Sequence, residues 1–234
     1  MTTIAANLQT VHSRIASACA AAQRHVNEVT LLPVSKTFGP EAVREAHAAG
    51  ETAFGENYIQ EAVEKQALLA DLHLQWHCIG PIQSNKTRMV AQHFDWAHTI
   101  DRLKIAQRLS EQRPQDRAPL SVCIQVNIDG GPSKAGVPPG EALALAREIS
   151  GLPRLKLRGL MTIPEPSEDF ATQLAAHRQA RALFDALRDA GLAIDTLSMG
   201  MTGDLEAAIH AGSTMVRVGT AIFGTRPPKL TSGA

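Results

Sequence analysis

Short apolar runs alternate with amphipathic stretches along most of this sequence. Apolar runs bounded by turn residues predict buried β-strands. We expect strands at Val29–Val34, Thr52–Phe54, Gln75–Ile79, Trp96–Ile100, Ser121–Ile128, Leu157–Ile163, Thr196–Met199 and Met215–Val218. Helical spacing of apolar residues between them predicts helices at Glu41–Ala49, Gln60–Ala70, Asn85–Gln92, Arg102–Gln112, Gly140–Ser150, Phe170–Ala190 and Leu205–Ala211.

A further helix is predicted ahead of the first strand. Behind a capping Thr2 or Thr3, apolar residues recur at helical intervals, at Ile4, Leu8, Val11, Ile15 and Cys19. The segment lacks the apolar region of a signal peptide, and no part of the chain approaches the roughly 18 uninterrupted apolar residues of a membrane span. We therefore expect a cytoplasmic protein that does not enter a membrane.

Strands that alternate with helices through short connections predict parallel βαβ units. About eight such units close a barrel, and barrels of this type have about 250 residues; this chain has 234. An open, doubly wound sheet gives the same alternation, but we favour the barrel. The predicted fold class is thus α/β, a single (β/α)8 TIM-type barrel with an extra N-terminal helix. No linker divides residues 1–234, and Gly50, Gly191 and Gly212 follow predicted helices, where glycine fits the left-handed end.

Composition narrows the classes of function. Lys plus Arg and Asp plus Glu both number 23, so the formal net charge is zero. That balance gives no electrostatic basis for binding nucleic acid or an anionic membrane. Cys19, Cys78 and Cys123 are far apart and odd in number, which indicates buried thiols rather than disulfides, and no cysteine or histidine has a metal-binding spacing.

Polar residues at predicted strand ends are the candidates for chemistry, because catalytic groups of a barrel gather there. Lys36 ends the run Val34-Ser35-Lys36. Desolvation in a pocket can lower a lysine pKa and free its amine to attack a carbonyl; the alternative is a surface lysine. After the second strand, Asn57 either caps the next helix or hydrogen-bonds a ligand, and the cap is the more frequent explanation.

Two loops after the last strands indicate an anion site. Gly200-Met201-Thr202-Gly203-Asp204 and Gly219-Thr220 can present backbone N–H groups to a phosphate. Strand alternation directs Arg217 into the barrel, where either a carboxylate or a ligand should meet it.

Other polar residues have simpler explanations. We expect His77 to be a satisfied interior histidine, Asp101 to cap a helix, and the basic run Ser84–Arg88 to be a solvated helix end.

In combination, order and spacing, the motifs resemble the pyridoxal phosphate homeostasis protein family over nearly the whole chain. The stretches that carry the resemblance are Val34–Lys36, Phe54–Tyr58, Trp76–Lys86, Ser133–Gly136, Arg158–Met161, Leu197–Met201 and Val216–Gly224. The resemblance implies a barrel like the N-terminal domain of alanine racemase, with pyridoxal 5'-phosphate (PLP) held as a Schiff base on Lys36.

The resemblance also implies the remaining cofactor contacts. Asn57 would lie beside the ring and Arg217 at the pyridine nitrogen. The phosphate would lie near Met201, Thr202, Gly219 and Thr220. Thr202 stands where the family usually has serine, and Pro40 lies one residue later than in the family pattern; neither change removes a contact.

Three functions compete: a cofactor carrier in PLP homeostasis, a barrel-type PLP racemase or decarboxylase, and a Schiff-base aldolase without cofactor. Arginine at the ring nitrogen weakens the electron sink, and racemases of this fold have a second domain, for which this chain is too short, and a tyrosine acid or base. The single tyrosine here, Tyr58, is expected to pack. We therefore favour a monomeric, non-catalytic carrier that serves apo PLP-dependent enzymes. Lys134, on a loop expected to be mobile, would offer a second amine for cofactor entry or exit.

Overall fold

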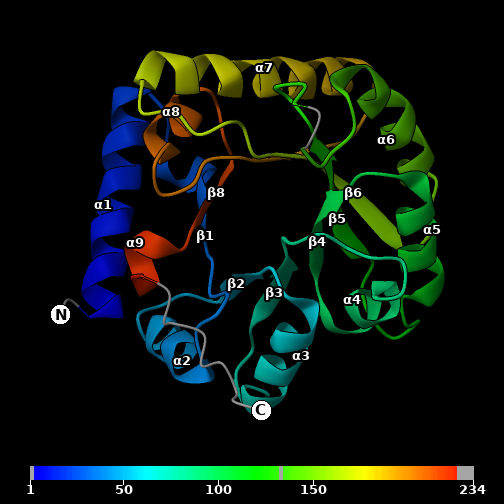
Figure 1. The fold of residues 1–234 in the computed structure, drawn as a ribbon, viewed down its shortest axis with the longest axis horizontal. Helices are drawn as coiled ribbons and strands as arrows, with labels where there is room; N and C mark the ends of the chain where they lie inside the picture. The colour runs from blue at the N-terminus through cyan, green and yellow to red at the C-terminus, as the bar shows by residue number, and fades with distance from the viewer. Residues whose placement is uncertain (1–2, 132–133, 226–234) are drawn as a thin grey trace, which may run out of the picture.

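Eight parallel strands form a nearly closed barrel with helices around it (Figure 1). The computed structural model describes residues 3–131 and 134–225. The strands are β1 (Thr30–Pro33), β2 (Ala53–Glu56), β3 (Gln75–Cys78), β4 (Trp96–Ile100), β5 (Leu120–Val126), β6 (Leu155–Thr162), β7 (Thr196–Ser198) and β8 (Met215–Val218). Their order is β1-β8-β7-β6-β5-β4-β3-β2, and a parallel bridge between Val34 and Gly55 joins the two end strands. The predicted barrel is confirmed, and the open sheet is excluded.

The helices follow the strands in alternation. They are α2 (Pro40–Ala48), α3 (Ile59–Leu68), α4 (Thr87–His93), α5 (Leu103–Gln112), α6 (Ala142–Ser150), α7 (Phe170–Asp189), α8 (Leu205–His210) and the short α9 (Thr220–Phe223). Two short 3-10 helices, Val26–Glu28 and Pro139–Glu141, complete the elements.

The extra N-terminal helix, α1 (Ile4–Ala21), begins at a Thr3 cap, as predicted. It packs against α8, α9 and α2 on the outside of the barrel (Figure 1). Its buried residues include Leu8, Val11 and Ile15. Because these side chains recur at helical spacing, one face of α1 covers the barrel where β8 meets β1.

Alternation along each strand separates the outer core from the barrel interior. In β8, Val216 and Val218 pack in the large core beneath the helices. Met215 instead joins an inner cluster, and Arg217 is buried inside the barrel, as its place between two valines predicts.

Local predictions are confirmed at most element ends. Gly50, Gly191 and Gly212 have positive φ after α2, α7 and α8. Asp101 is an exception, because Arg102 occupies the N-cap of α5 and Asp101 pairs with the Arg102 side chain instead. Within the described residues, no helix is long and apolar enough to cross a bilayer.

Candidate functional site

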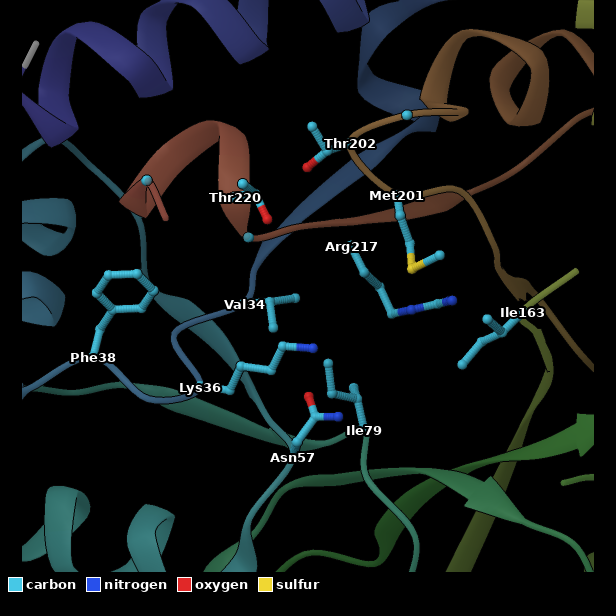
Figure 2. Close-up of a pocket in the computed structure, with 13 residues that line it drawn as sticks. Val34, Lys36, Phe38, Asn57, Ile79, Ile163, Met201, Thr202, Arg217 and Thr220 are labelled. Carbon is cyan, nitrogen blue, oxygen red and sulfur yellow. The ribbon is translucent and has the colours of Figure 1, made fainter. Parts of the chain in front are cut away.

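One cavity of about 230 Å³ opens where the carboxyl ends of the strands meet. All the predicted site residues line it (Figure 2): Lys36, Asn57, Met201, Thr202, Arg217, Gly219 and Thr220. They come from the ends of β1, β2, β7 and β8, so parallel strands bring together residues far apart in sequence.

Lys36 follows β1 on a loop that buried polar groups hold in place. Its neighbour Ser35 donates a hydrogen bond to Glu56 Oε1 at 2.6 Å, and the Lys65 ammonium donates to the same oxygen at 2.6 Å. Lys65 also donates to the Ser35 carbonyl at 2.9 Å. On the other side of Lys36, Thr37 has a left-handed φ of 69°. These constraints fix the backbone from which the Lys36 side chain enters the cavity (Figure 2).

Asn57 follows β2 and does not cap the next helix. The N-cap of α3 is Tyr58, without a side-chain cap bond, so the capping prediction for Asn57 is wrong. Asn57 Oδ1 is buried and has no hydrogen-bond partner within the described residues. The Asn57 backbone packs so closely that a Cβ on Gly80 would lie 2.0 Å from its carbonyl oxygen, which explains the glycine there. A buried acceptor without a partner indicates a site built for a ligand.

Arg217 supplies the buried positive charge of the cavity. Its guanidinium donates to Ser198 Oγ at 2.8 Å and to the Thr162 carbonyl at 2.9 Å. Within residues 3–131 and 134–225 it forms no ion pair with a carboxylate. Burial lowers the pKa of Arg217 to about 10, so the side chain is a cation and a donor at neutral pH. Of the two alternatives for this arginine, the structural ion pair is thus excluded.

The opposite side of the cavity consists of the loops after β7 and β8. Thr202, in the loop after β7, and Thr220, the first residue of α9, place their hydroxyl groups there (Figure 2). Gly219 approaches Val34 so closely that a Cβ would lie 3.2 Å from the Val34 carbonyl oxygen. The Met201 N–H, in contrast, donates to Asp204 Oδ1 at 2.6 Å, so Met201 contributes to the cavity through its side chain.

Apolar residues line the rest of the cavity, and they were not predicted from the sequence as part of the site. Ile79 and Ile163 follow β3 and β6, and Phe38 lies in the loop after Lys36. Their place at strand ends was a usable signal, but apolar side chains carry no chemical motif. The lining therefore combines an amine, a guanidinium and two hydroxyls with a largely apolar floor.

Other candidates fall outside this cavity. His77 is buried and hydrogen-bonded, as predicted. Tyr58, expected to pack, is 50% exposed and lines a surface cleft separate from the cavity. Cys19, Cys78 and Cys123 are free and buried, as predicted.

Lys134 and Lys86 lie apart from Lys36. Lys134 pairs with Asp129 at 2.8 Å and Glu165 at 3.1 Å. Its pKa is raised; the two carboxylates outweigh the opposing effect of partial burial, so the amine is kept protonated. The prediction of a mobile loop concerns residues 130–132, of which 132 lies outside the described residues. Lys86 lines a separate surface cleft with Tyr58 and Gln83.

Comparison with known proteins identifies relatives of this chain. A family model described as the alanine racemase N-terminal domain matches residues 10–227. The pyridoxal phosphate homeostasis protein of Pseudomonas aeruginosa is 59% identical over 226 residues, which cover 97% of each chain. Solved structures of PipY from Synechococcus elongatus PCC7942 align over most of both chains. The structure without PLP covers 95% of this chain and 100% of PipY, with a TM-score of 0.84 and 38% identity. The structure with PLP bound covers 90% and 100%, with a TM-score of 0.80 and 39% identity.

The eight-stranded parallel barrel and the matching family model define a barrel of the alanine racemase N-terminal type. Within that class, the chain belongs to the pyridoxal phosphate homeostasis protein family.

Proposed function

We propose that this protein binds PLP in the described cavity, as a Schiff base on Lys36, and stores or delivers it in intracellular PLP homeostasis. The observation that carries the proposal is the shared cavity of Lys36, Arg217 and the two threonine hydroxyls. The name of the Pseudomonas relative and the PLP-bound PipY structure support the choice of cofactor. The single barrel domain, 1–234, would act as a monomer in the cytoplasm.

The residues present fit the group. PLP combines an aldehyde, an aromatic ring with a basic nitrogen, and a phosphate. When bound, it supplies an aldehyde carbon with which the Lys36 amine condenses, with loss of one water molecule. Asn57, whose Oδ1 has no partner in the described structure, would lie beside the ring. Ile79, Ile163 and the other apolar residues would cover its faces.

Arg217 would donate a hydrogen bond to the ring nitrogen. A guanidinium has donors and no acceptor, so the nitrogen beside it is held without a proton. PLP stabilises a carbanion best when that nitrogen is protonated, usually opposite a carboxylate. Arg217 would therefore bind the ring while weakening its electron sink.

The loops after β7 and β8 would hold the phosphate. Thr202 and Thr220 offer hydroxyl donors, and Gly219 lets the backbone approach closely. Met201 would contribute its side chain rather than its backbone N–H, which Asp204 already occupies.

A carrier is favoured over a PLP enzyme by what lines the cavity. Within the described residues, Lys36 and Arg217 are its only titratable side chains. A racemase or decarboxylase remains the alternative, and apo PLP-dependent enzymes are the recipients we propose for the carrier. The relatives carry the name of homeostasis proteins rather than of enzymes, which supports this choice.

The test is the absorbance spectrum of the purified protein with PLP, before and after borohydride reduction. We expect a visible band that reduction removes, with the adduct on Lys36. Lys36→Ala should abolish the reducible adduct and leave weaker, noncovalent binding, whereas Lys86→Ala and Lys134→Ala should keep the adduct. A reducible adduct in Lys36→Ala would show that the assignment of the Schiff base to Lys36 is wrong. Lys134 and Lys86 would then be the next candidates.

Transfer and phosphate recognition need two further measurements. Incubation of the loaded protein with an apo PLP-dependent enzyme should restore that enzyme's activity faster than spontaneous release allows.

Thr202→Ala with Thr220→Ala should weaken the binding of PLP by about tenfold or more, since two hydrogen bonds to a charged group are lost. The binding of pyridoxal, which lacks the phosphate, should not change.

A further inference from the structure

A continuous chain of hydrogen bonds runs through the barrel interior from Arg217 to Gln75, the exposed first residue of β3. Arg217 donates to Ser198 Oγ at 2.8 Å, and Ser198 Oγ lies 3.0 Å from His98 Nδ1. His98 Nε2 lies 2.9 Å from His77 Nδ1, and His77 Nε2 lies 3.0 Å from Gln75 Oε1. Ser198 and His98 are 0% exposed and His77 is 1% exposed.

The chemistry of each group determines the direction of the donors. Arginine can only donate, so Ser198 Oγ accepts from it and has one proton left to give. With His98 Nδ1 accepting that proton, His98 Nε2 donates to His77 Nδ1, and His77 Nε2 donates to the Gln75 amide oxygen. Every group in the chain is then satisfied. The opposite direction would leave the Ser198 proton without an acceptor among the described residues, at the usual cost of a buried unsatisfied group.

The surroundings keep both histidines neutral, as this chain of donors requires. Burial, with the positive charge of Arg158 as a smaller cause, lowers the pKa of His77 to about 3. Burial also lowers the pKa of His98, and His77 and Arg217 reinforce the effect. Trp96 stacks on His77 with ring centroids 5.1 Å apart and has the Arg158 guanidinium over its ring. Near Arg217, Asp204 and Cys123 are the other titratable groups.

We propose that Ser198, His98 and His77 are positioning residues. They hold Arg217 as the donor to the cofactor ring nitrogen, and each of them donates its own proton in the direction away from that nitrogen. This inference rests on the proposed PLP site. The chemical consequence is that this hydrogen-bond chain transfers no proton to the ring nitrogen, so the bound cofactor stays a weak electron sink. The two histidines lie too deep to line the cavity, and they act only through Ser198 and Arg217.

The direction of the chain is tested on the cofactor-free protein by ¹⁵N NMR of the histidine rings. We expect His98 and His77 to carry their proton on Nε2 and to stay neutral from pH 5 to 8, and His77→Gln identifies the signals. A proton on Nδ1 of either ring, or titration of either ring in that range, would overturn the proposal. The result does not depend on whether PLP binds.

The positioning role is tested with PLP labelled with ¹⁵N at the ring nitrogen. In Ser198→Ala, Arg217 loses an acceptor and His98 loses its donor, so we expect PLP affinity to fall about tenfold. We also expect the ring nitrogen to become protonated at a higher pH than in the wild type. Ser198→Thr, which keeps the hydroxyl, should restore both properties.

Ser213→Ala is the matched control. Ser213 is also 0% exposed, but its hydroxyl donates to the Met199 carbonyl at 2.7 Å, with the carbonyls of Leu197 and Met215 also in reach, and no hydrogen bond joins it to Arg217 among the described residues. Ser213→Ala should lower the stability of the fold without changing the pH at which the ring nitrogen becomes protonated. Equal effects of Ser198→Ala and Ser213→Ala on that pH would refute the positioning role. Failure of the wild type to form the reducible adduct would instead refute the proposed function, while the NMR result would stand.

Discussion

The Ser35 hydroxyl donates to Glu56 Oε1 at 2.6 Å, and each of these residues immediately precedes a residue of the site. Lys36 follows Ser35, and Asn57 follows Glu56. The same carboxylate oxygen accepts from Lys65 on α3. One buried oxygen of β2 therefore joins the segment after β1 to α3, next in sequence to the two residues that enter the cavity.

Removing the ammonium from this cluster should destabilise the fold strongly. Lys65 is 4% exposed and Glu56 is 0% exposed. Burial raises the pKa of Glu56, while Lys65 and Ser35 oppose the shift. Lys65→Met leaves the carboxylate buried without its cation, so we expect a loss of about 3 kcal/mol in the free energy of unfolding, measured by urea denaturation at pH 7.

Two variants test the origin of this loss. Adding Glu56→Gln to Lys65→Met removes the stranded charge and should recover part of the stability. Arg44→Met breaks the exposed pair with Asp71 and should have a much smaller effect. If Arg44→Met and Lys65→Met were equally destabilising, the buried pair would have no special role.

Backbone strain beside Lys36 gives a second prediction. Thr37 (φ 69°) and Gln23 (φ 54°) are the two described non-glycine residues with positive φ. Glycine adopts this conformation without steric cost but loses more entropy on folding, so either substitution should stabilise the fold modestly, by about 0.5 kcal/mol. We expect Thr37→Gly alone to weaken PLP binding, about threefold, because it loosens the loop that presents Lys36. Equal affinities in Thr37→Gly and Gln23→Gly, measured by fluorescence titration, would contradict this role for the loop.

Acid should destabilise the protein through His77. The folded protein keeps His77 neutral down to a pKa of about 3, whereas the unfolded chain takes up a proton near the ordinary value of 6.5. The resulting stabilisation is complete above about pH 6.5 and is lost as the pH falls toward 3. Between pH 6 and 4, the free energy of unfolding of wild type should therefore fall more steeply than that of His77→Gln, by about 1.4 kcal/mol per pH unit. Parallel profiles would show that His77 does not titrate on unfolding.

Much of this architecture could be predicted because it depends on local pattern. Each strand of the barrel was expected within a few residues, since apolar runs and turn residues lie close together in sequence. The pattern also brought candidate residues together: Lys36 was expected at the face where the strands end, and strand alternation directed Arg217 into the barrel. The individual cofactor contacts came from the family resemblance instead.

Long-range contacts determine the parts that sequence could not supply. His98 and Ser198 are 100 residues apart, and no spacing rule links them. Asparagine is a common helix-cap residue, but the Asn57 side chain lines the cavity instead. The N-cap of α3 is Tyr58, which is exposed. The short helix α9 was also missed, because Thr220–Phe223 is too brief for a periodic pattern.

The bound cofactor should be inert toward amino-acid turnover. Removal of an α-proton needs a placed base, and racemisation needs an acid on the other face of the substrate; such groups typically contribute a factor of about 10² to 10⁴ in rate. Within the described residues, Lys36 and Arg217 are the only titratable groups of the lining; Lys36 would be engaged with the cofactor, and Arg217, whose pKa burial lowers to about 10, stays protonated at neutral pH. The test incubates the loaded protein with single L-amino acids in deuterated water and follows the α-proton by NMR, with free PLP at the same concentration as control. We expect exchange close to the control. Exchange, racemisation or decarboxylation at about 1 per second or faster, which is typical of enzymes, would contradict the carrier function and favour the racemase-like alternative.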